Sequence, residues 1–542
     1  MSNKSFLSII ILALLFLFFY GNSSYAEENF LMDINATYDL SDDNYTLVSL
    51  TNTVTNLTQN YVLGEQVLET GFSAVFDVTA YSSNKSLSAT VKAGGNGKIE
   101  LKFDNPVVGK GVTYDIKVSY KTTEALIKNG LTKEIYIPKV FGSTGISKYT
   151  VSIIFPHSLG SPQFISPKPT SYNDGKINNT IRFSESQIFT NGITVFFGDY
   201  QIYNFELFYD LANQDVFKRD FSIPIPPNIK DRQLVAISDI QPTPREIYKD
   251  EDGNYFAKIQ LASKESLSVR VSGLVKVIAV RADMAKSGKV DAVPSDIKKT
   301  YTVARPLWES NDLKIKQIGA DLFNPNLSVA QNAEKVYLFV KDTLDYNHDK
   351  TRETRLGAVK ALQNPTISVC MEYSDLTIAI LRSIGIPARE IEGYAYSEDI
   401  AKKPLSVFYN EETDFLHSWV EFYDPVLGWI PFDPTWGDTS GLDYFNNMDT
   451  NHISFIIKGH DSAGPLPPGS FRSTGSNAKQ INISFGSVEA WYTAKDLESM
   501  VTGITQNRFE DIILRDPLEI FLVLLLCGSF GFLLFHLVVR SK

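Results

Sequence analysis

The sequence predicts a multidomain protein in which a β-rich, sandwich-like N-terminal half precedes an α+β domain and one C-terminal transmembrane helix. Three observations carry this prediction. Apolar and polar residues alternate through the first half, as they do in half-buried strands. Helical spacing of apolar residues becomes prominent only after about residue 300. An apolar run from about 518 to 539 is long enough to cross a bilayer.

The first residues have the layout of a secretory signal peptide. Lys4 precedes an apolar stretch from Phe6 to Tyr20, and the small residues that end at Ala26 offer a cleavage site. The alternative is an uncleaved membrane anchor. The short apolar stretch disfavours it, because about 20 residues are needed to span a bilayer. We therefore expect residues 1–26 to be a signal peptide.

The C-terminal apolar run predicts a membrane anchor. Arg540 and Lys542 follow it, and basic residues favour the cytoplasmic side of a membrane. We expect a transmembrane helix at 517–539, a cytoplasmic tail at 540–542, and a single-pass type I protein of the cell membrane with the bulk of the chain extracellular. The N-x-S/T motifs after the expected signal peptide fit a surface glycoprotein, and they begin at Asn35, Asn44, Asn56, Asn84, Asn178, Asn326 and Asn482.

The composition disfavours nucleic acid as a partner. The chain has 51 Lys or Arg against 62 Asp or Glu, a net charge of -11, and no basic cluster. No magnesium, nucleotide or haem signature appears, so we expect no cofactor and no resident metal. A calcium requirement stays open, although no EF-hand spacing is present.

The β-rich half is expected to form one or two sandwich-like domains, at 27–135 and 136–285. Apolar side chains alternate with polar ones at 114–120 and again at 267–271, and turn-forming residues separate such runs. The segment 221–230 reads as a linker or an edge strand. We expect this half to act as a spacer or to bind surface partners.

Helices and a hairpin are expected in the α+β domain, at 300–460. Ser328 is a candidate N-cap for a helix that runs to about residue 344. A short second helix starts near Arg355, and a third is expected from Met371 to Ile384, before a C-terminal glycine. Two apolar runs flank "DPVLG", which is typical of a β-hairpin.

The segment that follows this domain is rich in turn residues. We expect a linker and juxtamembrane segment at 461–516, with a short amphipathic helix from about 495 to 514.

Cys370 is one of only two cysteines, and the other, Cys527, lies in the predicted membrane helix, so a disulfide between them is not expected. Unpaired backbone N–H groups and the helix dipole favour a thiolate at a helix start. Taken alone, a cysteine is usually a small buried hydrophobe. A single free thiol at a helix start in an exported chain is nevertheless a candidate nucleophile.

His417 and Asp433 are expected at the same end of the hairpin, opposite or diagonal to each other, where their side chains can meet. A histidine held by a carboxylate is the base that an attacking thiol requires. Each residue also has a simpler interpretation, as a structural histidine or as a turn residue before Pro434. Together, Cys370, His417 and Asp433 form a complete set for acyl transfer.

These segments resemble the transglutaminase-like superfamily, which has a papain-like fold. The stretch "CMEYSDLTIAILRSIGIPAR" looks like the family's cysteine helix, and "HSWVEFYDPVLGWIPFDPTW" is similar to its histidine and aspartate strands. The resemblance covers about 328–459. It implies that Cys370 is the nucleophile, His417 the base and Asp433 the orienting acid.

Some positions depart from the family pattern. Ser368 stands where the family commonly has glycine, and Ser374 where it often has alanine. The side chain that would help the Cys370 amide to bind an oxyanion is open between Tyr346, Asn347 and a residue near Asn364.

Several neighbouring residues are expected to be structural. Glu372 and Tyr373 are expected either to shape the substrate groove or to cap the helix and pack against it. We favour the second interpretation. Trp419 is expected in the core and His452 in a structural role. His348 lies in a charged loop without partners of the kind that bind metals.

The predicted function is a membrane-anchored extracellular thiol enzyme that acts on glutamine carboxamides or peptide bonds of a protein or peptide substrate through a thioester. A lysine-like amine as second reactant gives cross-linking, whereas water gives deamidation or proteolysis. A cysteine protease of the same fold and an inactive cell-surface binding protein are alternatives. A peptide N-glycanase is disfavoured, because its paired Cys-x-x-Cys zinc module is missing from the sequence.

Overall fold

The computed structural model describes residues 29–494 and residue 497, with internal gaps at 60–63, 83–84, 93–96, 104–107, 139–144, 185–187, 189–191, 348–353, 396–415, 441 and 473–478. Several predictions lie outside the described residues: the signal peptide, almost all of the amphipathic helix at 495–514, the membrane helix at 517–539 and the tail at 540–542, together with Asn84, His348 and Cys527. No helix within the described ranges has both the length and the apolar character that crossing a bilayer requires. The contacts divide the chain into two units.

The first unit is made of strands and contains most residues up to 125, together with 137–157 and 168–190. Its larger sheet has eight strands in the order β13-β14-β11-β1-β2-β8-β4-β5, and its smaller sheet has the order β3-β7-β6. Edge-to-face contacts such as Phe103 with Tyr114 bury aromatic rings in its core. The bounds are β1 (Phe30–Asp39), β2 (Thr46–Asn56), β3 (Glu65–Glu69), β4 (Phe76–Ser82), β5 (Lys85–Ser86), β6 (Ser88–Val91), β7 (Lys98–Lys102), β8 (Thr113–Thr122), β11 (Ile146–Pro156), β13 (Ser171–Asp174) and β14 (Asn178–Ser184).

The alternation predicted at 114–120 is confirmed, because Tyr114, Ile116, Val118 and Tyr120 of β8 are all buried. The division expected at residue 135 does not match the contacts. Strand β1 pairs in parallel with β11, which brings residues 146–156 into the first unit. Strands β1 and β11 are more than 100 residues apart, so no local pattern in the sequence could predict that they pair.

The second unit begins with two further groups of strands. One sheet has the order β12-β15-β10-β9, and a sandwich combines β18-β21-β16-β28 with β17-β20-β19. Buried side chains such as Leu207, Ile223 and Val271 fill this sandwich. The bounds are β9 (Leu126–Asn129), β10 (Thr132–Ile137), β12 (Phe164–Ser166), β15 (Ile193–Phe197), β16 (Tyr200–Ala212), β17 (Arg219–Ile225), β18 (Gln233–Gln241), β19 (Glu246–Lys249), β20 (Tyr255–Leu261), β21 (Ser266–Ile278) and β28 (Ile481–Phe485).

Two uncertain segments of the sequence belong to this sandwich. Strand β17 is an edge strand, as one of the two interpretations of 221–230 predicted. Strand β28 lies within the segment expected to be a linker, and it pairs with the middle of β16. The linker prediction for 461–516 is therefore wrong at 481–485.

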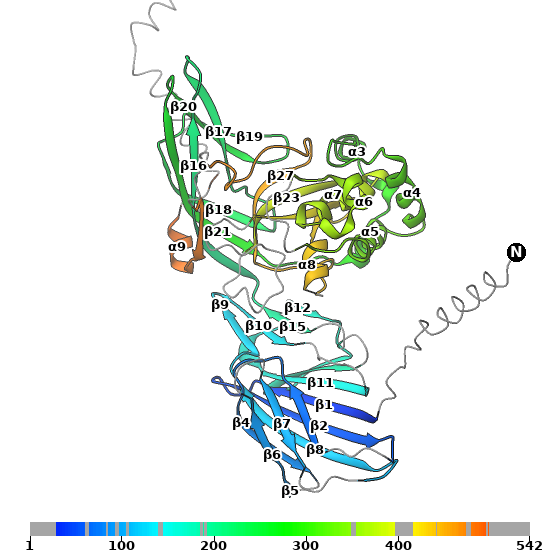
Figure 1. The fold of residues 1–542 in the computed structure, drawn as a ribbon. Coiled ribbons are helices and arrows are strands. Elements are labelled where there is room, and N and C mark those ends of the chain that lie inside the picture. Colours follow the sequence, from blue (N-terminus) through cyan, green and yellow to red (C-terminus); the bar gives the residue numbers. More distant parts are fainter. Residues whose placement is uncertain are drawn as a thin grey trace, which may run out of the picture. The chain divides into compact units, whose positions relative to one another are not determined.

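The remaining elements form the α+β part of the same unit. A sheet in the order β25-β24-β23-β27 carries helices on one side and faces the sandwich strands on the other, as Figure 1 shows. The bounds are β22 (Val280–Arg281), β23 (Ala388–Ala395), β24 (Leu416–Asp424), β25 (Gly428–Phe432), β26 (Asn447–Met448), β27 (His452–Lys458), α3 (Ser295–Tyr301), α4 (Leu313–Leu322), α5 (Val329–Thr343), α6 (Ala358–Gln363), α7 (Cys370–Ser383), α8 (Pro434–Thr439) and α9 (Val488–Thr493).

The local signals in this part are confirmed. Ser328 caps α5 in a capping box with Gln331. Helix α7 ends before Gly385, which has φ +78, a conformation that glycine adopts without strain. The turn of the β24–β25 hairpin closes at Gly428, where φ is +76. Each signal is carried by one or two residues, which is why the sequence could predict it.

Strand β27 is fixed against the sandwich by amide side chains. Gln233 Oε1 accepts a hydrogen bond from Ser454 N, and its Nε2 donates to Ser454 O, both at 2.8 Å. Asn254 makes the same pair of bonds with Ile457, at 2.7 and 2.8 Å. These bonds satisfy backbone groups on an otherwise unpaired sheet edge. They hold the strand on which His452 lies.

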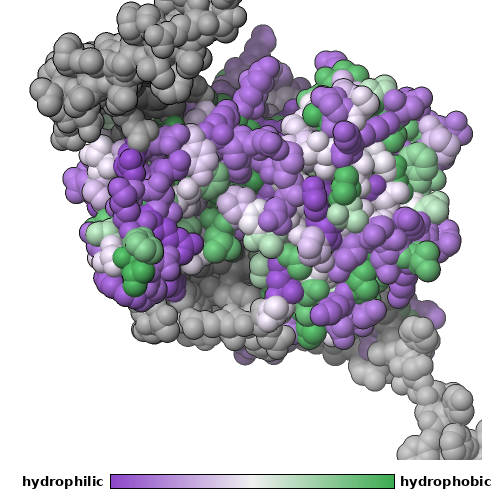
Figure 2. Space-filling view, turned by 90° about the horizontal axis from the view of Figure 1, so that it is seen from above, coloured by the Kyte–Doolittle hydropathy of each residue, from purple (hydrophilic) through white to green (hydrophobic). Residues whose placement is uncertain are grey.

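Figure 2 shows one face of the molecule. Its hydrophobic side chains lie scattered among hydrophilic ones, and this is ordinary for a protein surface.

Candidate active site

Cys370 is the first residue of α7, one residue earlier than predicted, and is a free cysteine with 9% of its surface exposed. The fully buried Glu372 fixes two segments of the chain that precede this point. Its Oε2 accepts a hydrogen bond from Val369 N at 3.0 Å, and its Oε1 accepts one from Leu356 N at 2.9 Å. Glu372 thus has the capping role favoured from the sequence.

The hairpin brings His417 and Asp433 together. Val420 pairs with Phe432, so the register places Asp433 diagonal to His417 on neighbouring strands. His417 Nε2 lies 2.7 Å from Asp433 Oδ2, and both side chains are fully buried. The other oxygen of Asp433 accepts bonds from Thr435 N and Trp436 N at the start of α8, at 2.8 and 3.0 Å. The carboxylate is therefore fixed in one orientation.

The second ring nitrogen of His417 is left for Cys370. The Nδ1 atom of His417 is buried and has no hydrogen-bond partner among the described residues. The Cys370 thiol nevertheless lies close enough to contribute to the pKa of the ring. Burial alone would lower the pKa of His417, but Asp433 and then Cys370 outweigh it and raise the pKa to about 9. This shift of the pKa favours the imidazolium form of His417 at neutral pH.

Asp433 is an anion in this setting. Burial would raise the pKa of its carboxyl group, but the charges and hydrogen bonds of His417 and His452 hold it well below the usual range. A buried carboxylate is stable only when it is paired and hydrogen-bonded.

His452 was expected to be structural, yet its imidazole lies against the same carboxylate. His452 Nε2 is 3.2 Å from Asp433 Oδ2, and His452 Nδ1 is 2.8 Å from Asp449 Oδ1. Strand β27 brings it there by pairing with β23, 19 residues after Asp433 in the sequence. No motif in the sequence connects the two residues.

Aromatic side chains surround His417. The ring of Trp436 lies 5.4 Å from it at an interplanar angle of 29°, and the ring of Trp419 lies 5.9 Å away at 30°. Both indoles are buried, as predicted for Trp419. They keep water away from the His417–Asp433 pair, and this strengthens its electrostatic interaction.

The candidates for oxyanion binding are placed differently. Asn364 donates its amide to Lys360 O at 3.0 Å, and Asn347 donates its amide to Thr366 O at 3.2 Å. Tyr346 lies near the thiol: burial first, and the charge of Cys370 second, raise the pKa of its hydroxyl group. Of these residues, Tyr346 is the one whose pKa the charge of Cys370 raises.

The two serines that depart from the family pattern are both fully buried. Ser368 O accepts a bond from Asn347 N at 2.8 Å, which places this residue in a short bridge beside Tyr346. Ser374 Oγ lies 2.8 Å from Ser418 Oγ, so its hydroxyl is accommodated by a partner on β24.

Two residues of the recognised segments, Arg389 and Glu421, are structural. They face each other directly in the β23–β24 register, and Arg389 Nε donates to Glu421 Oε2 at 2.6 Å. Arg232 from the sandwich pairs with the same carboxylate. The pair ties the cysteine segment to the histidine strand.

A second cluster of ion pairs joins α7 to β23, and no motif in the sequence predicted it. Arg355 Nε donates to Asp375 Oδ2 at 2.9 Å, and the same guanidinium reaches Glu390 and Glu392. Burial raises the pKa of Asp375 to about 7, although Arg355 opposes the shift. Lys458 completes the cluster by pairing with Glu392 at 2.6 Å.

The donor atoms of His417, Asp433 and His452 are close enough to suggest a metal site. The distances do not fit one. Two ligands of a tetrahedral zinc ion, each about 2.1 Å from it, stand roughly 3.4 Å apart. The 2.7 Å between His417 Nε2 and Asp433 Oδ2 is that of a charge-assisted hydrogen bond.

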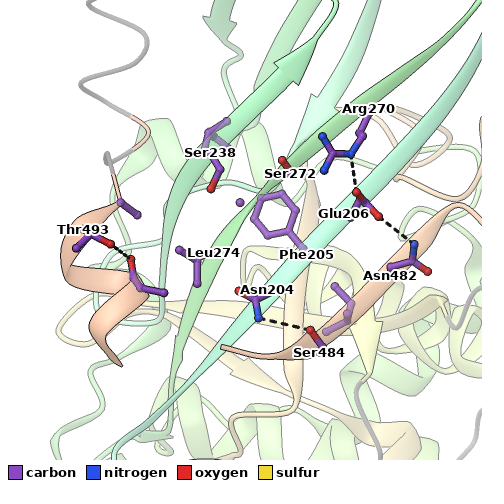
Figure 3. Close-up of a pocket in the computed structure, with 15 residues that line it drawn as sticks. Asn204, Phe205, Glu206, Ser238, Arg270, Ser272, Leu274, Asn482, Ser484 and Thr493 are labelled. Atoms are coloured by element: carbon purple, nitrogen blue, oxygen red, sulfur yellow. Dashed lines mark hydrogen bonds and ion pairs between the residues drawn. The ribbon is translucent and has the colours of Figure 1, made fainter. Parts of the chain in front are cut away.

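A large groove lies elsewhere in this unit, between α9 and the sheet of β16, β18, β21 and β28, and has a volume of about 740 Å³ (Figure 3). Its charged side chains pair with each other: Arg270 bonds to Glu206, which also accepts a bond from Asn482 at 3.3 Å. The described groove contains no cysteine or histidine. The size of this groove is therefore no reason to place the active site in it.

Comparisons with known proteins agree with this geometry. A family profile described as "Transglutaminase-like superfamily" matches residues 316–434. The uncharacterized protein YebA of Bacillus subtilis (strain 168) is 30% identical over 164 residues, which cover 30% of this chain and 20% of that protein. A "Protein-glutamine gamma-glutamyltransferase" of Pseudomonas aeruginosa is 34% identical over 67 residues, which cover 12% of this chain and 10% of that protein.

The chain thus spans a fifth or less of the length of these curated relatives. A solved structure described as "a Putative Cysteine Protease" from Cytophaga hutchinsonii shares 17% identity, covers 53% of this chain and 88% of its own, and has a TM-score of 0.35. The family profile includes Cys370, His417 and Asp433 within one matched segment. The domain that contains these three residues therefore belongs to the transglutaminase-like superfamily.

Proposed function

We propose that the protein is a thiol enzyme of acyl transfer in which Cys370 is the nucleophile, His417 the base and Asp433 the residue that orients His417. The observation that carries the proposal is the fully buried bond of 2.7 Å between His417 Nε2 and Asp433 Oδ2. It leaves the other ring nitrogen for the thiol at the start of α7. A buried imidazolium between a thiol and a carboxylate is suited to holding a thiolate ready for attack.

The proposed reaction has two steps. The sulfur of Cys370 attacks the carbonyl carbon of a carboxamide or peptide, a C–S bond forms, and the C–N bond breaks as His417 gives its proton to the departing amine or ammonia. A second nucleophile, an amine or water, then attacks the thioester. His417 takes the proton of this nucleophile, the C–S bond breaks, and Cys370 leaves as the thiolate. Asp433 stabilises the imidazolium in both steps.

Transfer to an amine is the outcome we favour over hydrolysis. Trp419 and Trp436 enclose His417, and Cys370 is largely buried, so access of water to the thioester is restricted. The similarity of 67 residues to a protein-glutamine gamma-glutamyltransferase supports a glutamine carboxamide as the acyl donor. A cysteine protease of the same fold is the second candidate.

The setting of this chemistry is part of the proposal and rests on the sequence. A signal peptide at 1–26 and a membrane helix at 517–539 would place the enzyme at the cell surface, anchored as a single-pass type I protein. The β-rich first unit would then act as a spacer or bind partners at that surface.

The test is mass spectrometry of a glutamine-containing peptide incubated with the full-length protein, with and without cadaverine. We expect incorporation of cadaverine in the wild type and none in Cys370→Ala. Conversion of glutamine to glutamate would assign hydrolysis, and cleavage of the peptide would assign proteolysis. An unchanged peptide, or modification that persists in Cys370→Ala, would contradict the proposal.

A further inference from the structure

His452 connects two carboxylates in the interior of the second unit. Its Nε2 lies 3.2 Å from Asp433 Oδ2 and its Nδ1 lies 2.8 Å from Asp449 Oδ1. Its side chain is 1% exposed, and those of Asp433 and Asp449 are 0% and 4% exposed. Asp433 Oδ2 is thereby shared between His452 and His417, whose rings lie 5.6 Å apart.

This geometry fixes the charge of the ring. A neutral imidazole carries one N–H and can donate to only one carboxylate; its other nitrogen presents a lone pair. A lone pair facing a carboxylate oxygen at a buried position would leave two acceptors opposed. Because both nitrogens of His452 face carboxylate oxygens, the ring is an imidazolium with two N–H donors.

The titratable groups around His452 support the same state. Asp433 follows β25, Asp449 precedes β27, His417 lies on β24, and Tyr444 has its ring 5.7 Å away. Burial would lower the pKa of His452, but the charge of Asp449 and the bonds to Asp433 and Asp449 raise it to about 9.

Asp449 is itself anchored from two directions. Tyr444 donates its hydroxyl to Asp449 Oδ2 at 2.9 Å, and Asn451 donates its backbone N–H to Asp449 Oδ1 at 2.8 Å. Asn451 is in turn bonded by the hydroxyl of Tyr203, which comes from β16 of the sandwich. The carboxylate that charges His452 is therefore fixed by both halves of the unit.

We propose that His452, held as an imidazolium by Asp449, is a positioning residue for the active site. It keeps the carboxylate of Asp433 ionised and turned toward His417. Along this row the charges alternate: Asp449 is negative, His452 positive, Asp433 negative and His417 positive. The inference rests on the proposed function, since it assigns a role relative to the same reaction.

The test is the pH profile of kcat for cadaverine incorporation by the full-length protein carrying Asp449→Asn. The amide still accepts a bond from Nδ1 but removes the negative charge, so the pKa of His452 returns toward the ordinary value of about 6.5. We expect the variant to lose activity as the pH rises through about 7, whereas the wild type holds its activity toward pH 9, where His417 and His452 titrate. KM should change little.

Asp443→Asn is the matched control. Asp443 lies in the same loop and accepts hydrogen bonds from Phe445 N and Asn446 N, both at 3.1 Å. In the described part of the chain it bonds to neither histidine. Its variant should keep the profile of the wild type. The proposal would be overturned if Asp449→Asn lowered kcat by the same factor at every pH and kept the alkaline part of the pH profile unchanged. His452 would then have only a structural role.

A second measurement separates this inference from the proposed reaction. The chain has six histidines, so NMR with histidine-specific ¹⁵N labelling can follow each ring. In the wild type at pH 8 both ring nitrogens of His452 should carry a proton, and in Asp449→Asn only one should. Titration of His452 near its ordinary pKa in the wild type would overturn the inference, even if cadaverine incorporation depends on Cys370.

Discussion

At the scale of the residue, the central feature is one carboxylate that serves two imidazoles. Asp433 uses one oxygen for the backbone of α8 and the other for His417 and His452. Motifs in the sequence predicted Cys370, His417 and Asp433, because each lies beside a recognisable local signal: a helix start, a strand and a turn. His452 carries no such signal, since a strand pairing far along the chain brings it to the site.

Replacement of Asp433 by asparagine tests the role of its charge. An amide at 433 keeps the cap of α8 but loses the attraction that raises the pKa of His417. By comparison with other triads, we expect kcat for cadaverine incorporation to fall by on the order of 10³ to 10⁴. Circular dichroism should show an intact fold. Activity within tenfold of the wild type would show that the carboxylate does not orient the base.

At the scale of the element, helix α7 is held at its two ends by different means. Glu372 accepts two backbone N–H groups from separate segments at the start, and Gly385 provides a left-handed conformation after the end. The sequence predicted that the helix ends at Gly385, because glycine is common directly after the end of a helix. The bond from Leu356 N to Glu372 was not predicted, because Leu356 lies in the segment before α6, 16 residues earlier in the sequence.

Substitutions at the two ends should have different effects. In Glu372→Gln one of the two backbone N–H groups faces an amide donor instead of a carboxylate, so we expect a loss of about 2 kcal/mol in the free energy of unfolding. The start of α7 should loosen as well, with slower alkylation of Cys370. Urea unfolding and alkylation rates measure both effects.

Gly385→Ala is the control for that experiment. Among the described residues, the new Cβ meets only Val290 Cγ1, at 3.8 Å. The cost is therefore the backbone conformation, about 1 kcal/mol. The alkylation rate should stay that of the wild type. Equal alkylation rates in Glu372→Gln and Gly385→Ala would contradict the role assigned to Glu372.

At the scale of the whole molecule, the active site depends on contacts that span the sequence of the second unit. The sandwich supplies Gln233, Asn254 and Tyr203 to β27 and its preceding loop. The sequence predicted a β-rich half and an α+β domain, and both are present. It did not predict that the sandwich and the α+β part pack as one unit, because side-chain bonds between distant strands make that connection.

The buried histidines make stability depend on pH. Both His417 and His452 have a folded-state pKa of about 9, above the unfolded value of about 6.5. A raised pKa stabilises the folded state fully below the unfolded value, and this stabilisation is lost as the pH rises through the folded value. We expect the melting temperature to fall between pH 7.5 and 9.5.

A control variant isolates the contribution of His452. In His452→Gln the fall over the same window should be smaller, because one titrating ring is missing. Asp375, with a pKa of about 7, changes its contribution mainly below this window. A melting temperature that stays constant from pH 7.5 to 9.5 in the wild type would contradict the charged state of both histidines.

The most direct test of the central claim is the rate at which iodoacetamide alkylates Cys370 at neutral pH in the full-length protein, followed by mass spectrometry of the peptide that contains it. The account predicts faster alkylation than that of a free cysteine, and a rate at least about tenfold lower in His417→Ala, because the imidazolium no longer stabilises the thiolate. Slow alkylation that His417→Ala leaves unchanged would contradict the account.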